Sequence, residues 1–80
     1  MRVDEERLRG AVIAGLRIKP GQYRADLKLG DLEEWDSLGH LELIAEVEKA
    51  FGVSLSLDDI PKLSSLDALR AHLAALSAAG

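Results

Sequence analysis

Residues 35–43 read Trp-Asp-Ser-Leu-Gly-His-Leu-Glu-Leu and mark the point where an irregular segment gives way to a helix. Asp36 and Ser37 are residue types that cap helix N-termini, and Gly52 suits the left-handed conformation that follows a helix C-terminus. The apolar residues between these signals repeat at helical spacing. The sequence therefore predicts a helix that is capped by Asp36 or Ser37 and runs to Phe51.

One side of this helix carries large apolar side chains. At about 100° per residue they fall in one sector of the helical wheel. They are Leu43, Ile44, Val47 and Phe51. We expect this set to face the core and expect truncation of Phe51 to be among the most damaging changes. His40 lies in the same sector, and we expect it to be partly buried and hydrogen-bonded.

The opposite side of the helix carries a second apolar strip. It consists of Leu38, Leu41 and Ala45, with Glu42 and Glu48 on its flanks. The helix cannot bury both sides in a small bundle, so we expect the strip to be exposed. An apolar centre with a charged rim is typical of a transient docking surface, although scattered surface leucines also occur without a function.

Signals elsewhere predict an all-α fold, a four-helix bundle in a single domain over residues 1–80. Asp4 caps a first helix that ends near Leu16. The segment from Arg17 to Trp35 has no sustained helical period, so we expect a long loop whose leucines pack against the bundle. Further signals predict a short third helix around 58–63, a last helix capped by Ser64 or Ser65, and a frayed tail at 77–80.

Length and composition exclude several classes of protein. A chain of 80 residues forms one small core and cannot hold separate cofactor and substrate lobes. It has no cysteine and two histidines, so we expect no disulfide, no thiolate chemistry of its own and no metal site. Because no apolar run approaches the ~20 residues that span a bilayer and no signal-peptide pattern is present, we expect a cytoplasmic protein without a membrane span.

The net charge of −4 conceals an acidic segment, since residues 29–60 contain nine acidic and one basic side chain. Binding to nucleic acid needs a basic surface that neutralises phosphates. We therefore expect no nucleic-acid partner and a basic protein partner instead. The acidic run from Asp31 to Asp36 lacks the alternating ligands and central glycine of a calcium loop, so we interpret it as surface charge.

The Asp-Ser-Leu run at residues 36–38 resembles the segment of acyl and peptidyl carrier proteins in which a serine carries 4′-phosphopantetheine at the start of the second of four helices. The resemblance covers the chain well from Trp35 onward, through Phe51-Gly52, Leu55, Ile60 and Leu63. The first helix and the long loop agree in kind. The tripeptide alone is common, but its position at a helix start after a long loop in a small acidic chain makes it specific.

The resemblance implies that a phosphopantetheinyl transferase attaches 4′-phosphopantetheine from coenzyme A to Ser37, with Asp36 and Leu38 completing the motif. The chain would then be a carrier and not a catalyst, holding an acyl group as a thioester on the thiol of the arm. A serine in the first helical turn suits this role because the phosphodiester would lie at the positive end of the helix. The positions that match partner-docking positions of the family are Leu38, Leu41, Glu42, Ala45, Glu48 and Ile60.

Some features depart from carriers of fatty-acid synthesis, which usually have a Leu-Gly pair before the serine and few basic residues. The Trp-Asp-Ser-Leu form looks more like discrete carriers of specialised pathways such as polyketide, peptide or modified-sugar assembly. An aminoacyl or peptidyl cargo remains open, as does an unmodified helical interaction module. A hydrolase built on Ser37, His40 and Asp36 is not favoured, because a chain this small shows no evident oxyanion hole or cleft. We expect a monomer whose partners are the transferase, a loading enzyme and downstream biosynthetic enzymes, and we expect Trp35 to anchor the loop on the bundle.

Overall fold

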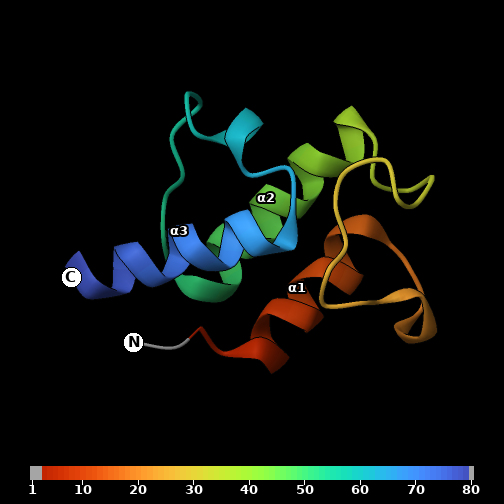
Figure 1. Ribbon diagram of the computed structural model, residues 1–80, viewed down its shortest axis with the longest axis horizontal. Coiled ribbons are helices and arrows are strands. Elements are labelled where there is room, and N and C mark those ends of the chain that lie inside the picture. The colour runs from red at the N-terminus through yellow and green to blue at the C-terminus, as the bar shows by residue number, and fades with distance from the viewer. Residues whose placement is uncertain (1–2, 80) are drawn as a thin grey trace.

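The computed structural model describes residues 3–79, and side chains up to Leu76. In this part of the chain three α-helices are present: α1 (Glu5–Leu16), α2 (Ser37–Phe51) and α3 (Leu66–Ala79). Two single turns of 3₁₀-helix, η1 (Pro20–Gln22) and η2 (Ile60–Lys62), lie in the connections. Figure 1 shows the helices packed together, with the long α1–α2 loop at one end of the molecule. The all-α prediction is confirmed.

Helix α1 begins and ends where the sequence predicts. The Asp4 carboxylate accepts a hydrogen bond from the Arg7 amide at 3.1 Å, which satisfies one of the free N–H groups of the first turn. Its buried face includes Leu8, Val12 and Leu16. Gly15 lies against α2 so closely that a Cβ there would be 2.6 Å from the Leu43 Cα. The crossing of α1 and α2 therefore depends on a residue without a side chain.

Helix α2 buries most of its predicted core face. Leu43, Ile44 and Val47 are buried, whereas Phe51 is only half-buried. Phe51 is the last residue of the helix, so its ring packs at the edge of the core and not within it. The prediction for Leu43, Ile44 and Val47 is confirmed. Phe51 packs against the core at its edge, and the expectation that its truncation is among the most damaging changes stays a prediction.

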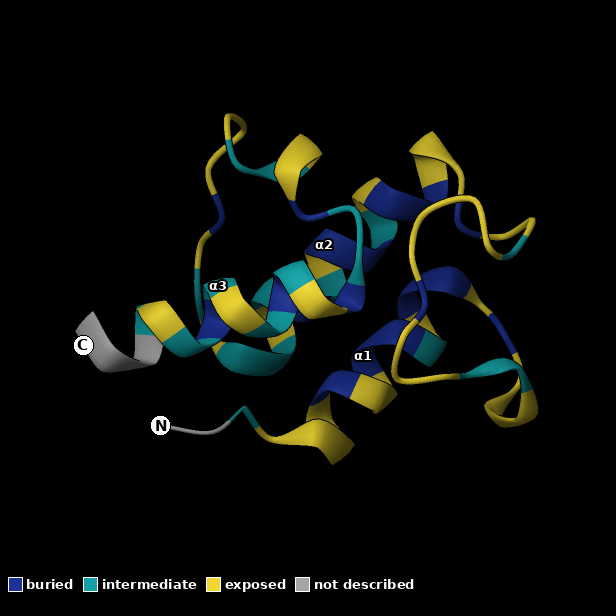
Figure 2. Ribbon diagram, viewed as in Figure 1, coloured by how far each residue is buried: buried dark blue, intermediate teal, exposed yellow. Residues whose placement is uncertain are grey.

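The long loop between α1 and α2 is anchored at a few points. Ile18, Leu27 and Trp35 are buried, whereas Leu29 is exposed. Figure 2 shows this pattern as short dark-blue stretches in a loop that is otherwise mostly exposed. Lys28 and Ser65 form an isolated antiparallel bridge that ties the loop to the start of α3. The loop prediction is confirmed apart from the turn η1 and the exposed Leu29.

The predicted third helix is a single 3₁₀ turn, η2, in the structure. Before it, Ser56 and Asp59 hydrogen-bond to each other through side chains and backbone, and such local bonds compete with helix formation. Pro61, inside the turn, lacks an N–H to extend a hydrogen-bonded series. Helix α3 then begins with its Ala68 amide bonded to the Ser65 hydroxyl at 3.0 Å, so Ser65 is the cap. Its backbone is helical to Ala79, into the predicted tail, while Gly80 lies outside the described residues.

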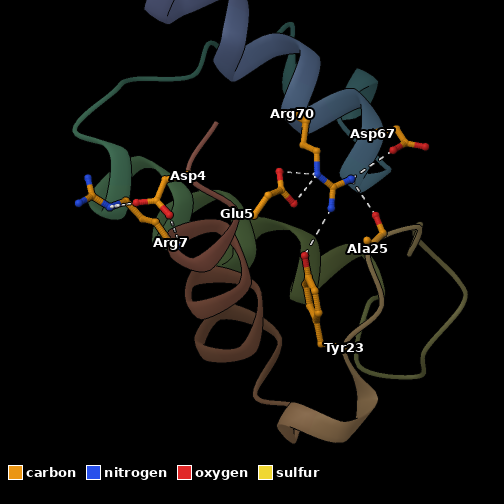
Figure 3. A network of polar contacts seen from close by, with 7 residues as sticks. All are labelled: Asp4, Glu5, Arg7, Tyr23, Ala25, Asp67 and Arg70. Carbon is orange, nitrogen blue, oxygen red and sulfur yellow. Dashed lines mark hydrogen bonds and ion pairs between the residues drawn. The ribbon is translucent and has the colours of Figure 1, made fainter. Parts of the chain in front are cut away.

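Arg70 of α3 holds three parts of the fold together (Figure 3). Its guanidinium binds the Glu5 carboxylate of α1 with Nε 2.9 Å from each oxygen, the Ala25 carbonyl at 2.7 Å and the Tyr23 hydroxyl at 3.4 Å. Burial acts to lower the pKa of Arg70, but the hydrogen bonds and charges of Glu5 and Tyr23 outweigh it, so the pKa is raised. Arg70 stays charged and fixes the loop to both helices.

Within residues 3–79 no helix combines the length and the apolar character that crossing a membrane requires.

Candidate functional site

The start of α2 presents Ser37 to solvent. Asp36 precedes it in an extended conformation, and its carboxylate oxygen Oδ1 accepts a hydrogen bond from the Gly39 amide at 2.8 Å. Asp36 is therefore the capping residue, and Ser37 is an exposed residue of the first turn. A serine that only capped the helix would turn its hydroxyl toward the backbone. The cap is thus provided by Asp36, and Ser37 beside it is exposed to solvent.

The first turn of α2 lies directly against the end of the long loop. Gly39 is buried, and a Cβ at this position would overlap the Glu34 carbonyl oxygen and lie 3.3 Å from Oδ1 of Asp36. The absence of a side chain at Gly39 thus allows the loop to approach the helix immediately beside Ser37. Sequence reasoning missed this role, because a glycine inside a helix gives no indication of which backbone lies against it.

A buried hydrogen-bond chain fixes the other side of this turn. The indole Nε1 of Trp35 and the Nδ1 of His40 are 3.0 Å apart, and the Nε2 of His40 is 2.8 Å from the Ile60 carbonyl oxygen. An indole N–H only donates, so Nδ1 accepts, and Nε2 carries the proton that it donates to Ile60. Trp35 is buried, as expected of a loop anchor, and His40 is hydrogen-bonded as predicted but more deeply buried than expected. The chain joins the loop before Ser37 to the turn η2.

This geometry bears on the hydrolase alternative. Both ring nitrogens of His40 are engaged, one by Trp35 and one by Ile60, and the Asp36 carboxylate caps the helix. A serine hydrolase instead needs a histidine nitrogen directed at the serine hydroxyl and a carboxylate on the other nitrogen. Ser37, Asp36 and His40 are neighbours, but they do not form a catalytic triad.

The apolar strip of α2 is exposed, as predicted. The exposed fraction is 67% for Leu38 and 55% for Leu41, and Ala45 is exposed as well. Glu42 lies beside the strip and is half-exposed. Two large apolar side chains are thus exposed on the helix that also bears the candidate serine.

Glu48 and Ile60 are less free than the other predicted docking residues. The Glu48 carboxylate accepts a hydrogen bond at 2.7 Å from the amide of Leu55, in the connection that follows α2. Ile60 is half-buried against the core, and its carbonyl accepts the bond from His40. Glu48 therefore has a structural role that the sequence did not indicate. The spacing from Glu48 to Leu55 crosses the end of the helix, where wheel geometry no longer applies.

His72, the second histidine, is half-buried, with its Nε2 3.9 Å from a carboxylate oxygen of Asp59. Within the part of the chain that the structure describes, no three His, Asp or Glu side chains are grouped closely enough to hold a metal ion.

Comparison with known proteins adds one finding. A family model described as a phosphopantetheine attachment site matches residues 6–73. The match includes nearly all of α1, the long loop, the whole of α2 with Ser37, and the first half of α3. No curated protein and no solved structure matches the chain.

Proposed function

The chain belongs to the phosphopantetheine attachment-site family, whose domains carry covalent 4′-phosphopantetheine, and we propose that Ser37 is the residue to which the arm is attached. The observation that carries the proposal is the division of roles at the start of α2, where Asp36 caps the helix and Ser37 is exposed. The exposed hydroxyl is placed to attack the pyrophosphate of a coenzyme A that a separate transferase holds, which forms the phosphodiester on Ser37 and releases adenosine 3′,5′-bisphosphate. The attachment point is also rigid, because it lies in the first turn of a helix.

The residues around Ser37 fit a phosphodiester. The first turn of α2 carries the positive end of the helix dipole and backbone N–H groups that are not used within the helix, and both favour a negative group. Gly39 and the Trp35–His40–Ile60 chain hold the neighbouring backbone in place. The arm supplies a thiol, which holds an acyl group as a thioester and which the cysteine-free chain lacks. The chain itself orients the attachment point and performs no bond-making step.

The proposal also covers what the carrier holds and which enzymes it serves. The carrier presents an acyl thioester to partner enzymes of a specialised biosynthetic pathway, a choice supported by the Trp-Asp-Ser-Leu form of the motif and by ten basic residues in the chain. The partners dock on the exposed strip of Leu38, Leu41 and Ala45, with Glu42 as a charged flank. Glu48 and Ile60 lie at the border of this surface and contribute less, because each is held by contacts within the fold.

The proposal is tested by intact-protein mass spectrometry after incubation with coenzyme A and a broad-specificity phosphopantetheinyl transferase. The wild-type chain should gain the mass of one phosphopantetheine, and Ser37→Ala should gain none while it keeps the helical circular dichroism of the wild type. Modification of Ser37→Ala would place the attachment at another residue. A folded wild-type chain that gains no mass would favour the unmodified interaction module.

A further inference from the structure

The path from Ser37 into the core is closed by a buried polar side chain. His40 follows Ser37 by three residues, and residues at this spacing are neighbours on a helix surface, with Cβ atoms about 5–6 Å apart. Ser37 is exposed, whereas His40 is only 6% exposed. The Nε2 of His40 is 2.8 Å from the Ile60 carbonyl oxygen of η2. A group tethered to Ser37 that entered the bundle between α2 and η2 would therefore have to pass this bond.

The hydrogen bonds of His40 are unfavourable to open. Among the residues whose side chains the structure describes, every buried side-chain nitrogen and oxygen has a hydrogen-bond partner. Nδ1 of His40 accepts from the indole of Trp35 at 3.0 Å, and Nε2 donates to Ile60. Displacement of the imidazole would leave the indole N–H and the Ile60 carbonyl without these partners. A buried polar group that loses its partner destabilises the fold by more than a typical hydrogen bond contributes.

The space behind His40 is filled by Trp35. The indole stacks on the imidazole with the ring centroids 6.1 Å apart, and Trp35 is 1% exposed. An alkyl group that passed His40 would next meet this indole, and protein cores contain few voids that such a group could fill. It could enter the bundle here only by displacing both rings.

We propose that the Trp35–His40–Ile60 chain keeps the cargo of Ser37 outside the bundle, so that His40 is a specificity-determining residue and the cargo is a short or polar acyl group. The inference rests on the proposed function, because it concerns the group that the arm on Ser37 carries. A long alkyl group on this carrier would stay in water, where its apolar surface gains nothing from burial. A short or polar acyl group loses nothing by the exclusion.

The inference has a consequence for thermal unfolding. Each methylene group of the cargo that the fold buried should raise the Tm by about 3–6 °C. A carrier that sheltered an octanoyl group would therefore melt on the order of 10 °C higher than the same carrier with an acetyl group. For the wild-type protein we expect the two Tm values to agree within about 2 °C, which is less than the effect of one buried methylene.

The test loads the full chain with acetyl, octanoyl and ω-bromooctanoyl groups by means of a broad-specificity transferase and acyl derivatives of coenzyme A. An amide in place of the thioester keeps the cargo attached during heating, and intact mass confirms the loading before the Tm is measured. Trp35 is the single tryptophan of the protein, so its fluorescence reports contact with the bromine, which quenches indole emission. In the wild type we expect equal emission with octanoyl and ω-bromooctanoyl cargo.

Two substitutions assign the effect to His40. His40→Ala removes the ring and both hydrogen bonds. In this variant octanoyl cargo should raise the Tm by about 5 °C or more over acetyl cargo, and ω-bromooctanoyl cargo should quench Trp35. His40→Gln offers one acceptor and one donor in place of the two ring nitrogens, so it should restore the behaviour of the wild type.

Leu8→Ala is the matched control, because it also removes a buried side chain but leaves the bonds of His40 in place. The preceding residue, Arg7, has its Nη1 3.4 Å from the Ala50 carbonyl oxygen, which places this part of α1 near the end of α2 that lies away from Ser37. Leu8→Ala should melt below the wild type and show the same Tm with acetyl and octanoyl cargo.

Four results would overturn the inference: a wild-type Tm that rises with cargo length, quenching of Trp35 in the wild type, a His40→Ala variant that behaves as the wild type does, or an equal rise for Leu8→Ala. The last would mean that any loosening of the core admits the cargo. If His40→Ala does not fold, Trp35→Phe, which removes the indole N–H, replaces it, and the same rise in Tm with octanoyl cargo is expected. None of these results affects the proposed function, which fails if the wild-type chain gains no arm at Ser37.

Discussion

The indole N–H of Trp35 donates to Nδ1 of His40 across 3.0 Å, and the two rings stack with their centroids 6.1 Å apart. This bond selects one tautomer of His40 and directs the other ring nitrogen to the Ile60 carbonyl. Ser37 lies between the two residues in sequence. The backbone on both sides of the proposed attachment point is therefore held by one buried polar chain.

Substitutions at Trp35 and His40 should not be additive. Trp35→Phe leaves Nδ1 of His40 without a donor, and an unsatisfied buried group costs about 1–3 kcal/mol. His40→Leu similarly leaves the Trp35 N–H and the Ile60 carbonyl unpaired. In the double variant the donor and the acceptor of the Trp35–His40 bond are removed together, so neither is left unpaired by loss of the other. The loss of unfolding free energy in the double variant should therefore be smaller than the sum of the losses in the two single variants by about 0.5–3 kcal/mol. Urea unfolding followed by far-UV circular dichroism measures all three values, and strict additivity would mean that the bond contributes nothing.

Gly39 should tolerate no side chain. The Cβ of Gly39→Ala overlaps the Glu34 carbonyl, so the loop before Ser37 must move. Such overpacking typically costs about 1–3 kcal/mol. We also expect slower modification by the transferase, because the displaced segment includes Asp36, which caps the helix.

Gly10 provides the matched control for this substitution. It lies in α1, is exposed, and would meet no atom within 4 Å if it gained a Cβ. Gly10→Ala should therefore stabilise the chain by about 0.5–1 kcal/mol through helix propensity. Thermal unfolding of both variants gives the comparison, and equal stabilities for Gly39→Ala and the wild type would show that the loop is not held against α2 as the structure places it.

Glu48 should affect stability more than its exposed position on the helical wheel indicates. Glu48→Ala removes the acceptor of the part-buried Leu55 amide, with an expected cost of about 1–3 kcal/mol. Glu46→Ala is the control on the same helix and should stay within about 0.5 kcal/mol of the wild type. Chemical denaturation distinguishes the two variants. Equal unfolding free energies for Glu48→Ala and Glu46→Ala would mean that the hydrogen bond from Leu55 to Glu48 does not stabilise the fold.

Short-range signals predicted most of the helical structure. Asp4, the pair Asp36 and Ser37, and Gly52 predicted where α1 begins and where α2 begins and ends, because these features act within one helical turn. The structure selects Asp36 as the cap of α2. The exposure of Leu38 and Leu41 followed from the same periodicity. The role of Ser37 as the attachment residue was inferred from a resemblance, to which the structure adds the division of roles with Asp36.

Contacts between distant segments were beyond such reasoning. The close approach of Glu34 to Gly39 and the pairing of Arg17 with Glu42 depend on how the long loop and α1 pack on α2. The predicted third helix is reduced to one 3₁₀ turn by the Ser56–Asp59 hydrogen bonds and by Pro61. Helix propensities of the single residues do not predict the combined effect of these two features. Of these contacts, the approach of Glu34 to Gly39 lies directly beside Ser37.

The position of the modified residue tests the central claim most directly. Cleavage of the modified chain after lysine and arginine releases residues 29–49, which contain Ser37 as their only hydroxyl-bearing residue. Ser54 and Ser56 fall in the next peptide, and Ser64 and Ser65 in the one after it. We predict that the mass of one phosphopantetheine appears on the 29–49 peptide alone and that fragment spectra place it on Ser37. The same mass on any other peptide would contradict the account.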